Sequence, residues 1–196
     1  KFDSDRHLKE FRLSVPAMDT RENGKHLFSL TDLTIGLRPM PDVATTLQLS
    51  ISVAEAQLSD LPPDIAWLGP DVGETVIWIE VENFYPLVEG LLDYTGWRVD
   101  GNQVHLRRGE TNWGPLDVAT RASIKLDRDN QPNGTVGVHL ENTEELLSAL
   151  DRAGLLDKEK NTAIATLGLM SRNNNFATVQ LKDRGIYLLG NKLGEY

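Results

Sequence analysis

Apolar and polar residues alternate along much of this chain, and the alternation predicts strands. Residues 47–53 read LQLSISV, so leucine, isoleucine and valine fall on one side and glutamine and serine on the other. Residues 118–126 alternate in the same way. A period of two is typical of antiparallel strands that have one buried and one solvated face. Shorter runs predict further strands at residues 11–15, 27–37, 176–181 and 186–189, and residues 99–108 predict strands around a hairpin turn at Asp100-Gly101.

A strand followed by a helix is predicted at two places that resemble each other. Residues 75–97 read TVIWIEVENFYPLVEGLLDYTGW, and residues 135–156 read TVGVHLENTEELLSALDRAGLL. Asn83 and Asn142 end the two strand patterns, where an asparagine side chain can accept a backbone N–H as a helix N-cap. Gly96 and Gly154 close the two units, and a left-handed C-cap is expected at Gly154. The two apolar stripes correspond at Leu87, Val88 and Leu91 and at Leu146, Leu147 and Leu150.

The order of these elements predicts the fold class. Asp157 is placed to cap a third helix over residues 157–170, but elsewhere strands follow strands. This order predicts an α+β fold, a mainly antiparallel, twisted or curved sheet of about eight or nine strands with about three helices. We expect the helices to cover the apolar face of the sheet, or the sheet to wrap partly on itself. The length fits a single domain, residues 1–196, with the two units suggesting pseudo-repeat halves at 27–97 and 98–196.

The net charge of −9 argues against nucleic acid as a partner. An acidic chain without a basic patch is a poor nucleic-acid binder, because neutralising phosphates supplies most of that affinity. The acidity is concentrated in residues 61–100, which hold eight acids and one base, Arg98. This block is either a solvated face that favours solubility or a docking surface for a basic partner.

Residues that could ligate a metal or a cofactor are sparse. The chain has no cysteine, which excludes disulfides, thiolate catalysis and cysteine-ligated metals. None of the four histidines pairs with another at ligand spacing; His7 and Glu10 are three residues apart, but a chain terminus is a poor scaffold for a metal. His105 and His139 fall at outward strand positions, as solvated or cross-strand polar residues. We therefore expect no metal and no cofactor.

Catalytic motifs are equally sparse, and we expect no catalytic residue. Glu80 and Glu82 share a strand face, but beside Asn83 we expect them at an exposed edge or helix cap. A different chemistry is suggested by the tryptophans. We expect Trp78, Trp97 and Trp113 among the walls of a ligand groove on the concave sheet face; the alternative is that they anchor the core and the turns.

The second half of the chain resembles a known family. The shared features are, in order, Trp97-Arg98, Gly101, Trp113-Gly114-Pro115-Leu116, Leu126-Asp127, Gln131-Pro132-Asn133-Gly134, AGLL at 153–156 and YLLG at 187–190. Together they resemble DUF2125, a Gram-negative envelope family of domains of unknown function. The resemblance implies a periplasmic domain tethered to the inner membrane by an N-terminal hydrophobic segment, which would account for a start at Lys1-Phe2. It implies no activity and no site residue.

Three functions are consistent with these patterns. The first is a non-catalytic envelope domain that binds a lipid or another apolar ligand in a groove of the curved sheet. The second is an envelope scaffold or protein-interaction domain that uses the acidic region or the loop around Trp67. The third, a hydrolase with paired carboxylates, has the least support, and we expect the chain not to be an enzyme. The predicted partners are an apolar small molecule or an envelope protein, with contact to the membrane only through the upstream anchor.

Overall fold

A computed structural model describes residues 9–40, 43, 45–172 and 175–196. In these residues the chain forms one mainly antiparallel sheet of eleven strands, four α-helices and a short 3-10 helix. The predicted α+β class with a mainly antiparallel sheet is confirmed. The expected numbers of eight or nine strands and three helices are too low, because β4 and β11 and the division of the first helix into two were not predicted.

The strands are β1 (Phe11–Glu22), β2 (Lys25–Pro39), β3 (Leu47–Val53), β4 (Glu55–Leu58), β5 (Asp71–Val81), β6 (Val104–Trp113), β7 (Leu116–Leu126), β8 (Pro132–Glu141), β9 (Ala177–Lys182), β10 (Gly185–Leu188) and β11 (Asn191–Glu195). The helices are η1 (Ala66–Leu68), α1 (Phe84–Val88), α2 (Tyr94–Val99), α3 (Thr143–Arg152) and α4 (Lys158–Met170).

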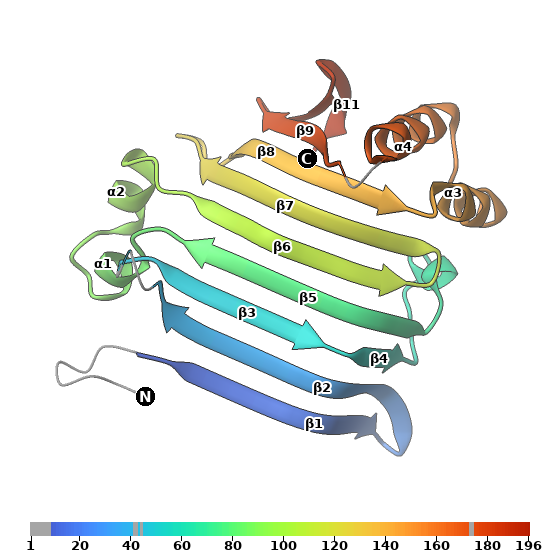
Figure 1. Ribbon diagram of the computed structural model, residues 1–196, viewed down its shortest axis with the longest axis horizontal. Coiled ribbons are helices and arrows are strands. Elements are labelled where there is room, and N and C mark those ends of the chain that lie inside the picture. Colours follow the sequence, from blue (N-terminus) through green and yellow to red (C-terminus); the bar gives the residue numbers. More distant parts are fainter. Residues whose placement is uncertain (1–8, 41–42, 44, 173–174) are drawn as a thin grey trace.

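The strands lie almost in chain order, in an open sheet that runs from β1 to β11 (Figure 1). Only the short β4 leaves this order, pairing with β2 and β5 beyond the end of β3. Helices α1 and α2 lie beyond one end of β5 and β6, while α3 and α4 lie beyond the other end and beside β8 (Figure 1). The strands of the middle of the sheet therefore carry no helix over them in this view.

The first strand is longer than predicted, because Pro16 does not end it. Strand β1 continues through Pro16 to Glu22. A proline is tolerated here because β1 pairs with β2 on one side and forms an edge of the sheet, where a ladder N–H can be missing. Asn23 and Gly24 then take positive φ of 51° and 80°, the backbone of a tight hairpin turn.

One predicted hairpin is wrong. Residues 99–108 were expected to form strands around Asp100-Gly101, but Val99 ends helix α2 and β6 begins at Val104. Gly101, with φ of 75°, follows the end of the helix instead. Asn-Gly and Asp-Gly pairs favour positive φ, and this backbone serves a helix end as well as a hairpin.

The two asparagines do precede helices, but they do not cap them. Asn83 and Asn142 have left-handed backbones, with φ of 46° and 50°, and neither side chain accepts a helix N–H. An N-cap needs an extended backbone to direct its side chain at the first turn, and a left-handed one does not do so. The predicted cap at Asp157 is confirmed: its Oδ1 accepts the N–H of Lys160 at 2.7 Å.

Most of the deeply buried apolar side chains fall into two groups. One group comprises Leu146 and Ala149 of helix α3 together with Ala177, Val179 and Leu188 of strands β9 and β10. A second group contains Trp97 of α2 and the start of β3, at the end of the sheet that carries α1 and α2. The apolar residues of the middle strands are only half-buried.

Candidate functional site

The sheet has an apolar face, defined here by a row of cross-strand neighbours. Because paired residues in adjacent strands point to the same side, one row can be followed across the sheet. From β1 to β10, omitting β4, the row is Phe11, Leu37, Leu49, Ile79, Leu106, Ala122, Val136, Val179 and Leu188. Every member is apolar, over nine paired strands.

The apolar face is covered at one end and open over its middle. Val179 and Leu188 are 8% and 4% exposed, and Leu188 lines a cavity together with residues of helix α4. Phe11, at the opposite edge, is 45% exposed, and the members between them are half-buried. Helix α4 packs against β8 and α3 packs against α4, whereas α1 and α2 lie beyond the strand ends (Figure 1). The expectation that helices cover the face therefore holds only near β8–β10.

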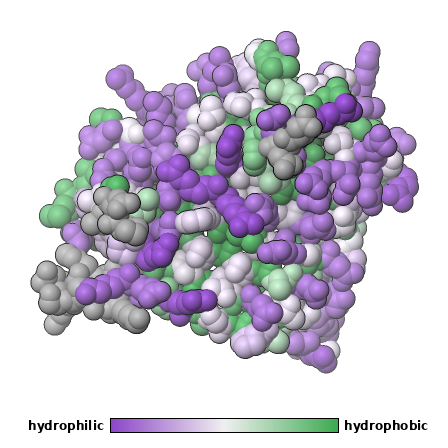
Figure 2. All heavy atoms as spheres, viewed as in Figure 1, coloured by the Kyte–Doolittle hydropathy of each residue, from purple (hydrophilic) through white to green (hydrophobic). Residues whose placement is uncertain are grey.

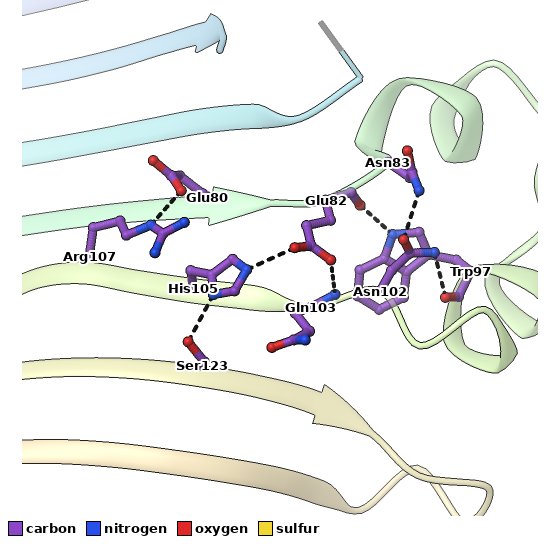
Figure 3. Close-up of polar contacts among 9 residues, drawn as sticks. All are labelled: Glu80, Glu82, Asn83, Trp97, Asn102, Gln103, His105, Arg107 and Ser123. Carbon is purple, nitrogen blue, oxygen red and sulfur yellow. Dashed lines mark hydrogen bonds and ion pairs between the residues drawn. The ribbon is translucent and has the colours of Figure 1, made fainter. Parts of the chain in front are cut away.

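The opposite side, the polar face, carries a hydrogen-bonded row across four strands. Arg38 of β2 donates through Nε to Gln48 of β3 at 2.7 Å, and Gln48 donates to Glu80 of β5 at 3.4 Å. Arg107 of β6 donates to the other carboxylate oxygen of Glu80 at 2.5 Å (Figure 3). Glu80 is only 5% exposed, so the expectation of an exposed edge or cap is wrong for this residue. A buried carboxylate requires such partners.

A second polar chain runs beside the first, toward helix α2. His105 lies between two partners: its Nε2 is 2.9 Å from Glu82 Oε1, and its Nδ1 is 2.9 Å from Ser123 Oγ (Figure 3). Glu82 also accepts the backbone N–H of Gln103 at 2.9 Å. His105 is thus the cross-strand polar residue that the sequence allowed, with a side chain that is 13% exposed rather than solvated.

The hydrogen-bonded series Glu82, His105 and Ser123 contains the carboxylate, imidazole and hydroxyl groups of a serine hydrolase, but its surroundings do not supply the other groups that acyl transfer needs. Acyl transfer also needs backbone donors aimed at the developing oxyanion. Ser123 lies inside β7 and has cross-strand partners on both sides, His105 of β6 and Thr135 of β8. The backbone N–H groups of such a central strand are committed to the ladders. These hydrogen bonds join β6 and β7 to the turn that follows β5.

The face seen in Figure 2 is mixed in polarity. Strongly hydrophilic residues cross its middle, and paler, weakly polar ones gather over the part of the sheet where Figure 1 places β2 and β3. The polar face also carries Arg108 and Glu110, an ion pair at 2.6 Å. The hydrogen bond from Arg108 lowers the pKa of the Glu110 carboxyl below its usual value.

The three tryptophans predicted to line one groove lie in three different places. Trp78 is opposite Ser50 on the polar face and is 37% exposed. Trp97 is 4% exposed and donates its indole N–H to the carbonyl of Glu82 at 2.5 Å. Trp113, at the end of β6, donates to the carbonyl of Gly69 at 2.8 Å. Trp97 and Trp113 thus serve as anchors, the alternative interpretation, and the structure does not bring the three together.

Sequence reasoning missed the polar row because its signal is weak. Glu80 and Arg107 are 27 residues apart, and nothing local indicates that they will meet. The available signal was that polar residues occupy the same parity in several neighbouring strands, at Gln48, Glu80 and His105. Once the strand order is known, that parity places them in a single row.

Searches for a metal site and for a membrane span give no candidate. In the described residues no group of three or more histidine, aspartate or glutamate side chains could hold a metal ion. His7 lies outside these residues, so the pairing with Glu10 is not addressed. None of the helices in the described part of the chain is long and apolar enough to cross a membrane.

Comparison with known proteins gives a family and no function. No curated protein and no solved structure matches the chain significantly. A protein-family model matches residues 4–195, which is nearly the whole chain, and its description is an uncharacterized protein conserved in bacteria. The chain therefore belongs to the DUF2125 family of uncharacterized bacterial proteins.

Proposed function

We propose that this protein is a non-catalytic domain of the bacterial envelope that binds a lipid, or another apolar molecule, on the apolar face of its sheet. The observation that carries the proposal is the uncovered middle of that face. Leu49, Ile79 and Leu106 lie side by side there and are only half-buried. Large apolar faces that stay open to water mark binding surfaces in soluble proteins.

The geometry favours a long, flexible ligand over a compact one. The apolar row continues for nine paired strands, each about 4.8 Å from the next. A second apolar row of Ile35, Ile51 and Ile77 lies beside it across β2, β3 and β5. An acyl chain laid along these rows would gain about 0.8 kcal/mol for each CH₂ group removed from water. An unfilled, enclosed pocket is not required for this mode of binding.

The proposal also covers where the domain lies in the cell. An apolar face open to solvent is useful where lipids must be held between membranes, and we place the domain in the periplasm, tethered to the inner membrane by an upstream segment. Fusion of the full-length natural protein to a reporter that is active only outside the cytoplasm tests this placement. Activity of a reporter that works only in the cytoplasm would contradict it.

The experiment for lipid binding is native mass spectrometry of the purified domain, followed by organic extraction. We expect a co-purified apolar species, or uptake of one on incubation with envelope lipids. The matched variants are Ile51→Asn and Ser52→Asn, which place the same side chain at neighbouring positions of β3 on opposite faces. Ile51→Asn should reduce loading at least about tenfold, because it puts a polar amide under the acyl chain. Ser52→Asn should not.

Two results would overturn the lipid proposal. One is a clean apo mass that stays unchanged after incubation with lipids. The other is equal loading of the two variants, since lipid would then be bound somewhere other than the apolar face. Thermal unfolding of both variants, compared with the parent, separates lost binding from lost folding.

A second candidate function has its own observation. Around α1 and α2, large apolar side chains are exposed and interleaved with acids; they are Val88, Leu91, Tyr94 and Val99, with Glu89, Asp93 and Asp100. This α1–α2 tip fits an envelope protein with an apolar centre and a basic rim. Leu91→Ser should abolish binding of such a partner without changing lipid loading, and the Ile51→Asn variant should do the reverse.

A further inference from the structure

A shallow cavity of about 330 Å³ lies on the polar face, over strands β1, β2, β3 and β5. We call it the trough and define it by Arg12, Gly36, Arg38, Ser50 and Trp78. It is on the opposite side of the sheet from the apolar face, so its occupant is independent of a lipid bound there.

The register of the strands explains why a trough forms. Arg12, Gly36, Ser50 and Trp78 are consecutive cross-strand neighbours in β1, β2, β3 and β5. The two inner residues are small and the two outer ones are large, so the row has a low floor between two walls. Arg12 and Trp78 are three strand spacings apart, about 14 Å. This leaves the width of one sugar-sized ring once the side chains are counted.

The floor is kept low by its own packing. A Cβ atom at Gly36 would lie 2.6 Å from Ser50 Oγ, which is closer than a Cβ atom comes to a non-bonded atom. A larger residue at position 36 would therefore displace the serine side chain. One end of the trough is closed by Arg38 and Gln48, which belong to the hydrogen-bonded row that includes the buried Glu80. This anchorage fixes the end wall before any ligand arrives.

The walls present hydrogen-bond donors that have no acceptor among the residues that the structure describes. In the described part of the chain Arg12 forms no hydrogen bond or ion pair, and the indole N–H of Trp78 has no acceptor. Arg38 uses Nε for Gln48, which leaves its terminal nitrogens available. One acid, Glu10, also lines the cavity. Two arginines that have no acidic partner among the described residues are a local exception in a chain whose net charge is −9.

We propose that the trough binds a sugar ring that carries a carboxylate or a phosphate group. The indole of Trp78, a residue that is 37% exposed, is a platform for the apolar face of a pyranose ring. Guanidinium groups at Arg12 and Arg38 match the two oxygens of a carboxylate or phosphate in bidentate geometry. The hydroxyl of Ser50, an exposed residue that also lines the cavity, suits a hydroxyl group of a sugar.

The test follows the indole N–H resonance of Trp78 by two-dimensional NMR, assigned with Trp78→Phe. The probes are glucuronate, glucose 6-phosphate, glucose and inorganic phosphate, each titrated up to tens of millimolar because monosaccharide affinities of this order are expected. Both anionic sugars should shift the Trp78 resonance. They should bind at least about tenfold more tightly than glucose or phosphate alone, since neither of these engages platform and arginines together.

Variants separate the two halves of the trough. Arg12→Ala and Arg38→Ala should remove the preference for anionic sugars over glucose, and Trp78→Ala should weaken both anionic sugars at least about tenfold. Arg152→Ala, which removes an exposed arginine of α3, is the charge-matched control and should change nothing. Arg12, Arg38 and Trp78 are exposed, and an unchanged unfolding midpoint would show that the variants fold.

Each other outcome overturns the proposal. No shift of Trp78 with any probe would mean that the trough binds no sugar. Equal affinity for glucose and glucuronate would remove the role of the arginines. Inorganic phosphate binding as tightly as glucose 6-phosphate, with no effect of Trp78→Ala, would reduce the trough to an anion site. Because Ile51→Asn lies on the other face, it should leave sugar binding intact, so failure of the lipid proposal and failure of this one are distinguishable.

Discussion

Two regions of the molecule follow the same plan and reach different results. In each, a strand (β5 or β8) is followed within two residues by an asparagine with left-handed backbone, Asn83 or Asn142. A helix follows and ends at a glycine with φ near 70°, Gly90 or Gly154. After each glycine, a backbone N–H donates to the carbonyl five residues earlier: Leu91 donates to Pro86, and Leu155 donates to Leu150. This is the hydrogen-bond pattern of a Schellman motif.

The plan continues identically past the glycines. Each reads Gly-Leu-Leu-Asp, at residues 90–93 and 154–157, and the aspartate of each caps the next helix. The sequence comparison matched Gly154 with Gly96; the structure matches it with Gly90. The difference is length. Helix α1 has five residues and α3 has ten, and helix α2 has six against thirteen in α4.

The comparison shows that the signals for helix ends are local, whereas helix stability comes from packing. Helices α3 and α4 pack on each other, and Leu146 of α3 is 5% exposed. The corresponding Leu87 of α1 is only half-buried, and Leu91 beside Gly90 is 78% exposed. A helix as short as α1 is not stable alone. The first unit depends instead on one anchor, Trp97 of α2.

The largest expected effect comes from removing that anchor. Trp97→Ala should lower the free energy of unfolding by about 3–5 kcal/mol, because it empties a buried site and leaves the carbonyl of Glu82 without its donor. Urea unfolding measures this loss. Trp97→Phe keeps most of the apolar volume and should cost less than the alanine variant. A loss below about 1 kcal/mol for Trp97→Ala would show that the first unit has another anchor.

The second expected effect contrasts the two apolar stripes. Leu146→Ala should cost about 2–4 kcal/mol, because the side chain is buried between α3 and its neighbours. Leu87→Ala should cost clearly less, and Leu91→Ala should stay within about 0.5 kcal/mol of the parent. Equal losses at Leu146 and Leu87 would mean that the first unit is packed as tightly as the second.

The contrast between the units also shows what the sequence could predict. Strands were predictable because a period of two is visible within a few residues, as at 47–53. The helix starts after Asn83 and Asn142 were predictable, but not the backbone there, because asparagine suits both an N-cap and a left-handed residue. The burial of Glu80 was not predictable, since it depends on Arg107 in another strand.

A third prediction distinguishes Asn83 from Asn142. Both have the same left-handed backbone conformation, but their side chains have different surroundings. Asn142→Ala should cost about 1 kcal/mol, because alanine tolerates positive φ poorly, whereas Asn142→Gly should be nearly neutral. Asn83 also donates to Asn102 at 2.7 Å, and Asn102 is buried. Asn83→Gly should therefore still cost about 1 kcal/mol, and Asn83→Ala more. Thermal unfolding of the four variants measures the differences, and a neutral Asn83→Gly would contradict the role given to Asn102.

The smallest expected effect concerns the cap of α4 in acid. Hydrogen bonds from Lys160, first from its backbone N–H, lower the pKa of the Asp157 carboxyl below its usual value. The folded pKa is therefore below the unfolded one, about 3.9. The stabilisation is complete above the unfolded pKa and is lost as the pH falls through the folded pKa.

Hydrogen exchange should show that the amides of α4 lose protection over that pH range. Asp157→Asn keeps a capping oxygen that does not titrate, so the acid-dependent part of the loss should disappear. Asp93→Asn, at the matching cap of α2, should leave the acid profile of α4 unchanged; if it altered that profile, the two caps would be coupled and the two units would not be independent.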